Sequence, residues 1–280
     1  MMETSPFVVD FDWLEGRIGT PGIVIIDASW YLPAQKRDAK AEYDAAHIPG
    51  AVFFDQDLVV EPDSDLPHTL PSPGIFAEFA GSMGISAGDT IVVYDGPGMF
   101  SAPRVWWMFR IMGAKQVFVL DGGFDRWKAD GRPVTDKLTK IAPSFFEADF
   151  DEARVARLDD MRAIVGKGQV ADARPAGRFA GTDPEPRAGV RGGHMPGAVN
   201  VPISGLSKDG KLLPVNALRD LLQERGVDLD KPVVTSCGSG VTAAVITLAL
   251  ESVGHTDNRL YDGSWTEWGG RSDTPVETGS

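Results

Sequence analysis

The sequence predicts an α/β fold made of two similar domains, each a mainly parallel sheet flanked by helices. Two observations carry this prediction. Three landmarks recur in the same order at spacings between 141 and 147 residues, which indicates a duplicated domain. Within each copy, short β-branched runs alternate with loops and with segments of helical periodicity, the pattern of a parallel sheet covered by helices. A chain of 280 residues is long enough for two ordinary domains.

Three matched segments define the repeat. IVIIDAS around Asp27 matches QVADARP around Asp172, and HIPGAVFFD matches HMPGAVNVP 147 residues later. LDGGFDRW, which contains Asp121, matches YDGSWTEW, which contains Asp262. The histidines of the two PGA segments belong to repeated turns, and we expect them to be structural. Asp121 and Asp262 each precede a glycine, so we interpret them as turn formers.

A change of composition predicts the boundary between the copies. ADGRPVTDKLTKIAPS is rich in Pro, Lys and Asp, as linkers are. We therefore expect a non-catalytic first domain over residues 1–135, a linker over 136–155 and a catalytic second domain over 156–280. The polar tail TPVETGS is expected to be mobile.

The apolar runs place the elements of each copy. IVIIDAS and IVVYDG in the first copy, and QVADARP and PVVTS in the second, are typical of short buried strands. KLLPVNALRDLLQERG has apolar residues at helical spacing and predicts a surface helix. After IVVYDG, the bulky Phe100, Trp106 and Trp107 suit packing against a neighbouring domain. We therefore interpret the first half as a scaffold that builds one wall of a site in the second.

Composition excludes several classes of partner and location. A hydrophobic content of 42% supports a packed core, and a net charge of −13 argues against nucleic acid and anionic membranes as partners. The single cysteine rules out an internal disulfide and a Cys-cluster metal site, so no metal or cofactor is expected. No apolar run approaches the roughly 20 residues that span a bilayer, and no signal peptide is visible at the N-terminus. These features predict a cytoplasmic protein.

The only cysteine, Cys237, follows a predicted strand over residues 232–236 and precedes a helix that begins near Val241 or Thr242. The intervening glycines, Gly238 and Gly240, allow a tight curl that aims backbone N–H groups and the positive end of the helix dipole at one atom. The cysteine sulfur is best placed to be that atom, which would favour the nucleophilic thiolate. The simpler alternative is a small buried apolar residue.

Alignment of the two copies puts Asp95 opposite Cys237, 142 residues earlier. The first copy therefore has no thiol. A cysteine-dependent phosphatase also cradles an anion between a strand and a helix, but it needs an arginine six positions after the cysteine, where this chain has Ala243. Phosphatase activity is therefore not expected.

The tandem copies, the paired H-[IM]-PGA turns, the closing DG-x-x-x-x-W segments and the single second-half loop resemble the rhodanese superfamily of sulfurtransferases. Within it, CGSGVT, SAPRVWWMFR and GRFAGTDPEPR look like the branch that acts on 3-mercaptopyruvate. Thiosulfate-preferring members typically carry basic residues after the cysteine, where this chain has Gly238 and Ser239. The resemblance implies two tandem rhodanese-like domains and transfer of sulfur from 3-mercaptopyruvate through a persulfide on Cys237, with release of pyruvate.

The resemblance also assigns residues. It implies substrate binding by Arg178 and Arg187, whose guanidinium groups suit the carboxylate and ketone of a 2-keto acid; by composition alone they would be ordinary solvated arginines. It suggests a relay in which Asp57 orients His68 and His68 tunes the hydroxyl of Ser239. The amides of the loop from Gly238 through Gly240 and Val241 to Thr242 would stabilise the persulfide.

Two other functions stay open at this point. A thiosulfate sulfurtransferase would use the same sulfur relay with a different donor, and a sulfur-carrier module would be loaded without turnover. The resemblance favours thioredoxin or a low-molecular-weight thiol as the acceptor.

Overall fold

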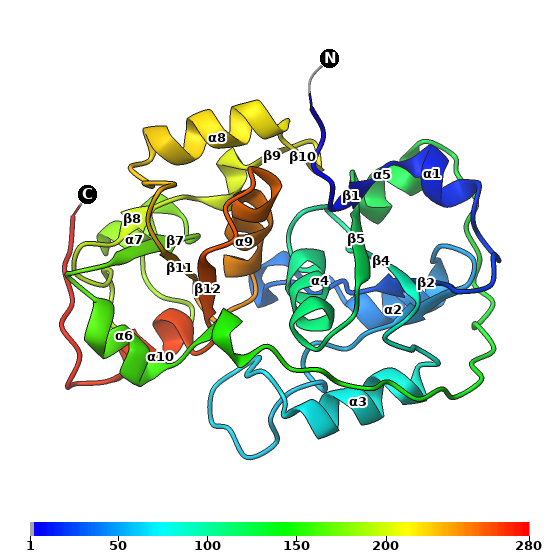
Figure 1. Cartoon of the computed structure of the whole chain (residues 1–280), viewed down its shortest axis with the longest axis horizontal. Coiled ribbons are helices and arrows are strands. Elements are labelled where there is room, and N and C mark those ends of the chain that lie inside the picture. Colours follow the sequence, from blue (N-terminus) through cyan, green and yellow to red (C-terminus); the bar gives the residue numbers. More distant parts are fainter. Residues whose placement is uncertain (1–2, 280) are drawn as a thin grey trace.

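The computed structural model describes residues 3–279 and contains one parallel sheet for each copy of the repeat (Figure 1). The strands of the first sheet are β1 (Val8–Val9), β2 (Ile23–Asp27), β3 (Ala51–Phe53), β4 (Thr90–Tyr94) and β5 (Gln116–Leu120). Their order is β1-β5-β4-β2-β3, and each neighbouring pair is parallel. The central strands are runs of Val and Ile because helices cover both faces.

The second sheet repeats this arrangement. Its strands are β6 (Val155–Ala156), β7 (Gln169–Asp172), β8 (Val199–Asn200), β11 (Val233–Ser236) and β12 (Asn258–Tyr261). The order β6-β12-β11-β7-β8 is again parallel throughout. A short antiparallel hairpin of β9 (Ser207–Lys208) and β10 (Lys211–Leu212) lies outside both sheets. The α/β fold class and the parallel sheets predicted from the sequence are confirmed.

Short helices flank the sheets (Figure 1). Those of the first half are α1 (Phe11–Glu15), η1 (Pro33–Gln35), α2 (Ala39–Ala45), α3 (Pro73–Ser82), α4 (Ala102–Ile111) and α5 (Gly123–Ala129). Those of the second half are η2 (Glu152–Arg154), α6 (Leu158–Ile164), α7 (Ala176–Ala180), η3 (Ile203–Gly205), α8 (Val215–Glu224), α9 (Ala243–Ser252) and α10 (Ser264–Gly270). Among residues 3–279, none of the helices is long and apolar enough to cross a membrane.

The segment from α5 to η2 has no helix or strand, apart from a bridge between Thr135 and His47. The division of the chain at residues 136–155 stays a prediction.

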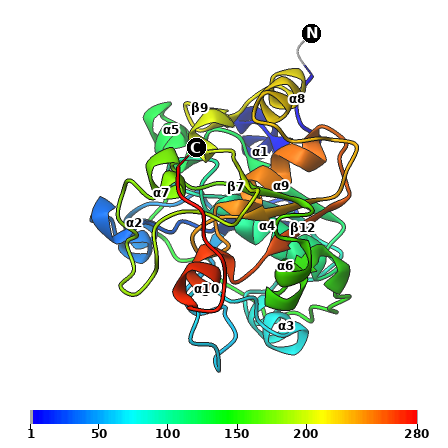
Figure 2. The same ribbon diagram turned by 90° about the vertical axis from the view of Figure 1, so that its left-hand side faces the viewer.

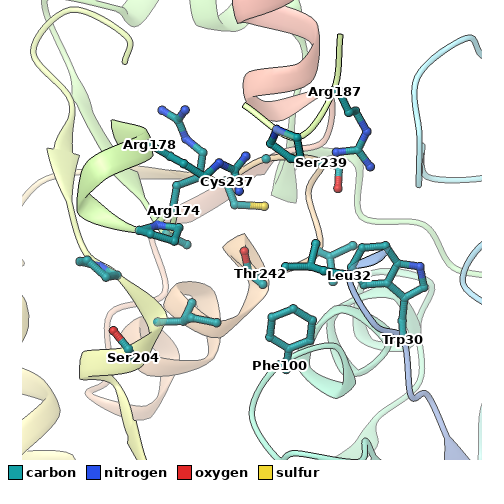
Figure 3. A pocket seen from close by; sticks show the side chains of 17 residues that line it. Trp30, Leu32, Phe100, Arg174, Arg178, Arg187, Ser204, Cys237, Ser239 and Thr242 are labelled. Carbon is teal, nitrogen blue, oxygen red and sulfur yellow. The ribbon is translucent and has the colours of Figure 1, made fainter. Parts of the chain in front are cut away.

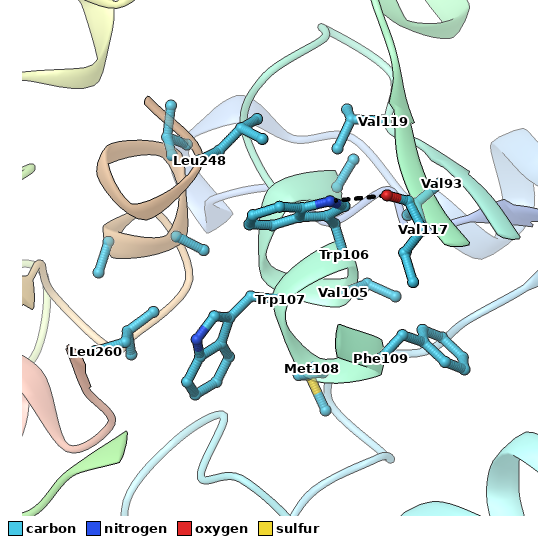
Figure 4. Close-up of a cluster of buried hydrophobic side chains, with 14 of the residues drawn as sticks. Val93, Val105, Trp106, Trp107, Met108, Phe109, Val117, Val119, Leu248 and Leu260 are labelled. Atoms are coloured by element: carbon cyan, nitrogen blue, oxygen red, sulfur yellow. Dashed lines mark hydrogen bonds between the residues drawn. The ribbon is translucent and has the colours of Figure 1, made fainter. Parts of the chain in front are cut away.

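Helices α4 and α9 pack against each other between the two sheets (Figure 1). Trp106 and Trp107 of α4 are fully buried and share one apolar cluster with Leu248 and Leu260 of the second half (Figure 4). The indole N–H of Trp106 donates to the carbonyl oxygen of Val117 at 3.0 Å, so its one polar atom is satisfied. Because the two halves share this core, we expect them to move as one body.

Each half also donates a backbone N–H group to an aspartate of the other half. The N–H of Leu212 donates to Asp121 at 2.8 Å, and the N–H of Leu70 donates to Asp262 at 2.8 Å. The two leucines are matched positions of the repeat, 142 residues apart. The interpretation of both aspartates as turn formers is therefore incomplete, because their carboxylates join the halves.

The C-terminal tail is ordered against the second half, contrary to the sequence-based expectation. It runs from α10 back to α7 (Figure 2), and Glu277 forms a backbone bridge with His194. The N–H of Gly279 donates to the carbonyl of Ala180 at 2.9 Å, and Thr274 is buried. The tail composition is polar, but its backbone pairs with the turn at His194, which composition alone does not reveal.

Candidate active site

Cys237 lies where β11 ends, at the start of a loop that leads into α9. Its side chain is only 1% exposed, yet the sulfur points into a cavity (Figure 3). Gly240 has φ +80°, and a Cβ there would lie 2.8 Å from the carbonyl oxygen of Asp262. The tight curl of the loop therefore requires glycine at this position. Gly240 faces the protein behind the loop, whereas Gly238, Val241 and Thr242 line the cavity.

The start of α10 holds the cysteine loop in place. The N–H of Trp265 donates to the carbonyl of Cys237 at 2.9 Å, and the N–H of Thr266 donates to the carbonyl of Gly238 at 2.8 Å. The Ser264 hydroxyl accepts from the N–H of Cys237 at 3.1 Å and lies 4.0 Å from its sulfur. Ser264 has φ +49°, at a position where the first copy has Gly123. Sequence analysis missed Ser264, although DGSW against DGGF was its visible signal.

The structure brings His68, Asp57 and Ser239 together. His68 Nδ1 lies 2.9 Å from the Ser239 Oγ, and His68 Nε2 lies 3.0 Å from Asp57 Oδ1. A carboxylate only accepts hydrogen bonds, so Nε2 carries the proton and Nδ1 accepts the Ser239 hydroxyl. The bond from His68 holds the pKa of Asp57 below its usual value. The relay crosses the two halves, because Asp57 and His68 lie between β3 and α3.

Trp30 supports this relay from the first half. Its indole N–H faces both carboxylate oxygens of Asp57 at 3.2 Å, and its ring meets that of His68 edge-on at 4.8 Å. Phe100 stacks against Trp30, with ring centroids 6.3 Å apart. Trp30, Phe100 and Leu32 form the apolar wall of the cavity (Figure 3). The sequence predicted such a wall from the first half but did not identify Trp30.

The opposite side of the cavity is cationic (Figure 3). Arg178 extends from α7 and is paired with Glu185. Arg187 is half-buried and makes no ion pair within residues 3–279. Burial, followed by the neighbouring Arg178 cation, lowers the pKa of Arg187. A guanidinium in this position favours an anion in the cavity.

Arg174 is a third cavity arginine that the sequence analysis did not name. It is 1% exposed, and its charge is matched by Asp172 at 2.7 Å and Glu185 at 2.8 Å. Glu185 therefore bridges Arg174 and Arg178, which fixes both guanidinium groups. A Cβ on Gly238 would lie 3.2 Å from Nη2 of Arg178, so a larger residue at this position would crowd that arginine.

The cavity encloses about 170 Å³ and has Cys237 on its floor, arginines on one side and aromatic rings on the other. A family model described as a rhodanese-like domain matches residues 10–130 and again residues 157–271. The chain belongs to the rhodanese family. The prediction of two tandem rhodanese-like domains is thereby confirmed.

Rhodanese-family relatives match this chain over almost its full length. The 3-mercaptopyruvate sulfurtransferase of Escherichia coli strain K12 is 43% identical over 279 residues, which cover 99% of each chain. The thiosulfate sulfurtransferase of Gallus gallus is 42% identical over 271 residues, which cover 93% of this chain and 92% of that protein. The crystal structure of SseA from Escherichia coli, described as having the rhodanese fold of 3-mercaptopyruvate sulfotransferases, superposes with a TM-score of 0.85 at 40% identity. That superposition covers 92% of this chain and 98% of SseA.

Proposed function

We propose that this protein is a 3-mercaptopyruvate sulfurtransferase that carries sulfur as a persulfide on Cys237. The observation that carries the proposal is the pairing of one thiol with two arginines and a Ser–His–Asp relay around a single small cavity. The Escherichia coli relative that bears this name supports it over the whole chain.

The keto acid fits the two sides of the cavity. Its carboxylate would bind between Arg178 and Arg187, and the ketone oxygen would face the same guanidinium groups. Arg187 would gain most, because its charge is half-buried and unpaired within the described residues. The sulfur-bearing carbon would then lie toward Cys237, against the apolar wall of Trp30 and Phe100.

The reaction needs a new S–S bond and one proton movement. The thiolate of Cys237 attacks the sulfur of 3-mercaptopyruvate, the carbon–sulfur bond breaks, and its electron pair stays on carbon as the enolate of pyruvate. The proton of the substrate thiol is then available for that carbon, so the products are pyruvate and an anionic persulfide. In our proposal Ser239 and His68 move this proton, since their 2.9 Å contact lets the hydroxyl exchange a proton with the ring.

The first half supplies an internal comparison for the persulfide. Asp95 stands at the position of Cys237, and its carboxylate accepts the N–H groups of Gly98, Phe100, Ser101 and Ala102 at 2.6 to 3.0 Å. This loop conformation therefore binds an anion at the end of that side chain. The terminal sulfur of a persulfide on Cys237 is an anion in the matching place, so the matching amides would stabilise it.

Thiosulfate is the alternative donor, and the Gallus gallus relative carries that name at nearly the same identity. The uncharged Gly238 and Ser239 favour the keto acid, because the loop adds no cation for a dianion. A sulfur carrier without turnover is the third possibility.

We propose thioredoxin or a low-molecular-weight thiol as the acceptor, since either attacks a persulfide by ordinary thiol exchange. The single cysteine is compatible with a reducing compartment, and we propose the cytoplasm.

Steady-state transfer to a common thiol acceptor, with 3-mercaptopyruvate and thiosulfate as parallel donors, tests the proposal. We expect a large kcat/KM advantage for the keto acid and a persulfide on Cys237 by intact mass. A preference for thiosulfate would keep the nucleophile and replace the donor. Loading without turnover would indicate a carrier.

A further inference from the structure

We propose that Arg104 and Asp262 form a positioning pair for this reaction, which fixes the loop that carries His68 against the loop that carries Cys237. The inference rests on the proposed function, because it assigns a role in the chemistry of the same cavity. Neither Arg104 nor Asp262 lines that cavity, so the pair acts through the groups that it holds.

Arg104 contacts the backbone of both loops. It lies on α4 in the first half and is 1% exposed. Its Nη2 donates to the carbonyl oxygen of His68 at 2.8 Å, and its Nη1 donates to the carbonyl oxygen of Gly240 at 3.4 Å. A planar guanidinium with several fixed donors can serve both acceptors at once, whereas the single ammonium of a lysine cannot reproduce this fork.

Asp262 completes the clamp on the histidine loop. Its Oδ1 accepts Nη2 of Arg104 at 2.7 Å, and its Oδ2 accepts the N–H of Leu70 at 2.8 Å. The ion pair therefore holds a carbonyl and an N–H group two residues apart. Between them the backbone is constrained, and His68 has φ +58°. That left-handed conformation costs a residue other than glycine about 1 kcal/mol, so it persists only where the surroundings impose it.

The matched positions of the repeat separate joining the halves from holding the histidine. Asp121 makes the equivalent bond to a backbone N–H of the other half. At the position of Arg104, however, the second copy has Ile246, and at the position of His68 it has Gly210, each 142 residues later. The halves are thus joined on that side without an arginine. The arginine occurs on the side where a histidine must keep its contact with the active-site serine.

The test replaces the pair as a unit. Arg104→Met combined with Asp262→Asn removes both charges, so no lone buried charge is left to unfold the protein. Asp121→Asn is the matched control, because it alters the equivalent bond between the halves on the non-catalytic side. With 3-mercaptopyruvate, and well below the Tm of each variant, we expect kcat of the double variant to fall about 10- to 100-fold, as a displaced catalytic group does. KM should change less than about threefold, because Arg178 and Arg187 keep their places, and the control should retain kcat within about twofold.

A His68→Ala background distinguishes positioning from general damage. If the pair acts through His68, its replacement in that background should lower kcat by no more than about twofold, because coupled residues are not additive. Losses of equal size in both backgrounds would overturn the proposal. Failure of the wild type to use 3-mercaptopyruvate would overturn the proposed function instead, and in that case the pair is judged without turnover. The NMR resonances of the His68 ring should then shift in the double variant while those of His47 stay in place; an unmoved His68 would again reject the pair.

Discussion

Replacement of Asp27 by Asn should stabilise the protein above pH 6 and remove a pH dependence of its folding. Asp27 ends β2 and is 2% exposed, and its carboxylate accepts the N–H of Ser29 at 2.9 Å. Burial raises the pKa of this carboxyl from 3.8 to about 6. At the matched position of the second sheet, Asp172 is instead neutralised by the guanidinium of Arg174 at 2.7 Å. The first half has Ser29 in place of that cation, so its aspartate is ionised in the core without a countercharge.

The sign and the size follow from the two pKa values. The unfolded chain releases the Asp27 proton near pH 3.8, whereas the folded protein holds it up to about pH 6. The folded state therefore binds more protons in this range, and the free energy of unfolding falls as the pH rises from about 4 to about 6. A difference of roughly two pKa units corresponds to about 3 kcal/mol. Asn is neutral throughout, so Asp27→Asn should gain up to about 3 kcal/mol at pH 7.5 and almost nothing near pH 4.

Urea unfolding, followed by tryptophan fluorescence at several pH values between about 4.5 and 8, measures this difference. The exposed Asp63 offers a control, because Asp63→Asn removes the same charge from the surface. We expect the gap between Asp27→Asn and the wild type to widen with pH, and the gap for Asp63→Asn to stay small. A gap that is constant with pH, or a variant less stable than the wild type at pH 7.5, would refute the reasoning.

The remaining predictions concern the cavity. Cys237→Ser should abolish sulfur transfer from 3-mercaptopyruvate, and intact mass should show no added sulfur; retained transfer would remove the thiol from the mechanism. Arg187→Ala should raise KM for the keto acid about 10- to 100-fold, the value of a charged hydrogen bond, and should raise KM for thiosulfate far less. Equal effects on both donors in steady-state assays would contradict a carboxylate role. Trp30→Phe keeps a ring against His68 but removes the N–H bond to Asp57; because Asp57 is largely exposed, kcat should fall only about two- to fivefold, and Trp30→Ala should lower it more.

The order of strands and helices could be predicted because it depends on local patterns and on the repeat. The helix after Cys237, expected from Val241 or Thr242 to Ser252, begins at Ala243 and ends at Ser252. The loop glycines were recognisable because a positive φ and close packing permit few other residues. These features need no knowledge of what lies across the cavity.

The supports of the site could not be derived in the same way, because they depend on contacts between distant segments. His68 and Ser239 are 171 residues apart, and only the family resemblance brought them together before the structure did. Trp30 and Glu185 act on other side chains rather than on the substrate, and an isolated tryptophan or glutamate gives no local sign of that. Arg104 sits in an apolar helix, where the sequence suggested only a packing surface. Its partners lie at residues 68, 240 and 262, on three separate loops.

Comparison of the two copies explains how a duplicated fold can hold one reactive centre. In the first copy the carboxylate of Asp95 fills its own loop and satisfies four N–H groups, so that loop has no free donor for a ligand. In the second copy the shorter cysteine side chain leaves the matching position open for one more atom. If the loop stabilises the persulfide as we propose, Cys237→Asp should close the site by placing a permanent anion there, and the variant should fold at least as stably as Cys237→Ser while transferring no sulfur. A Cys237→Asp protein that is markedly less stable than Cys237→Ser would mean that the second loop does not present its amides as the first one does.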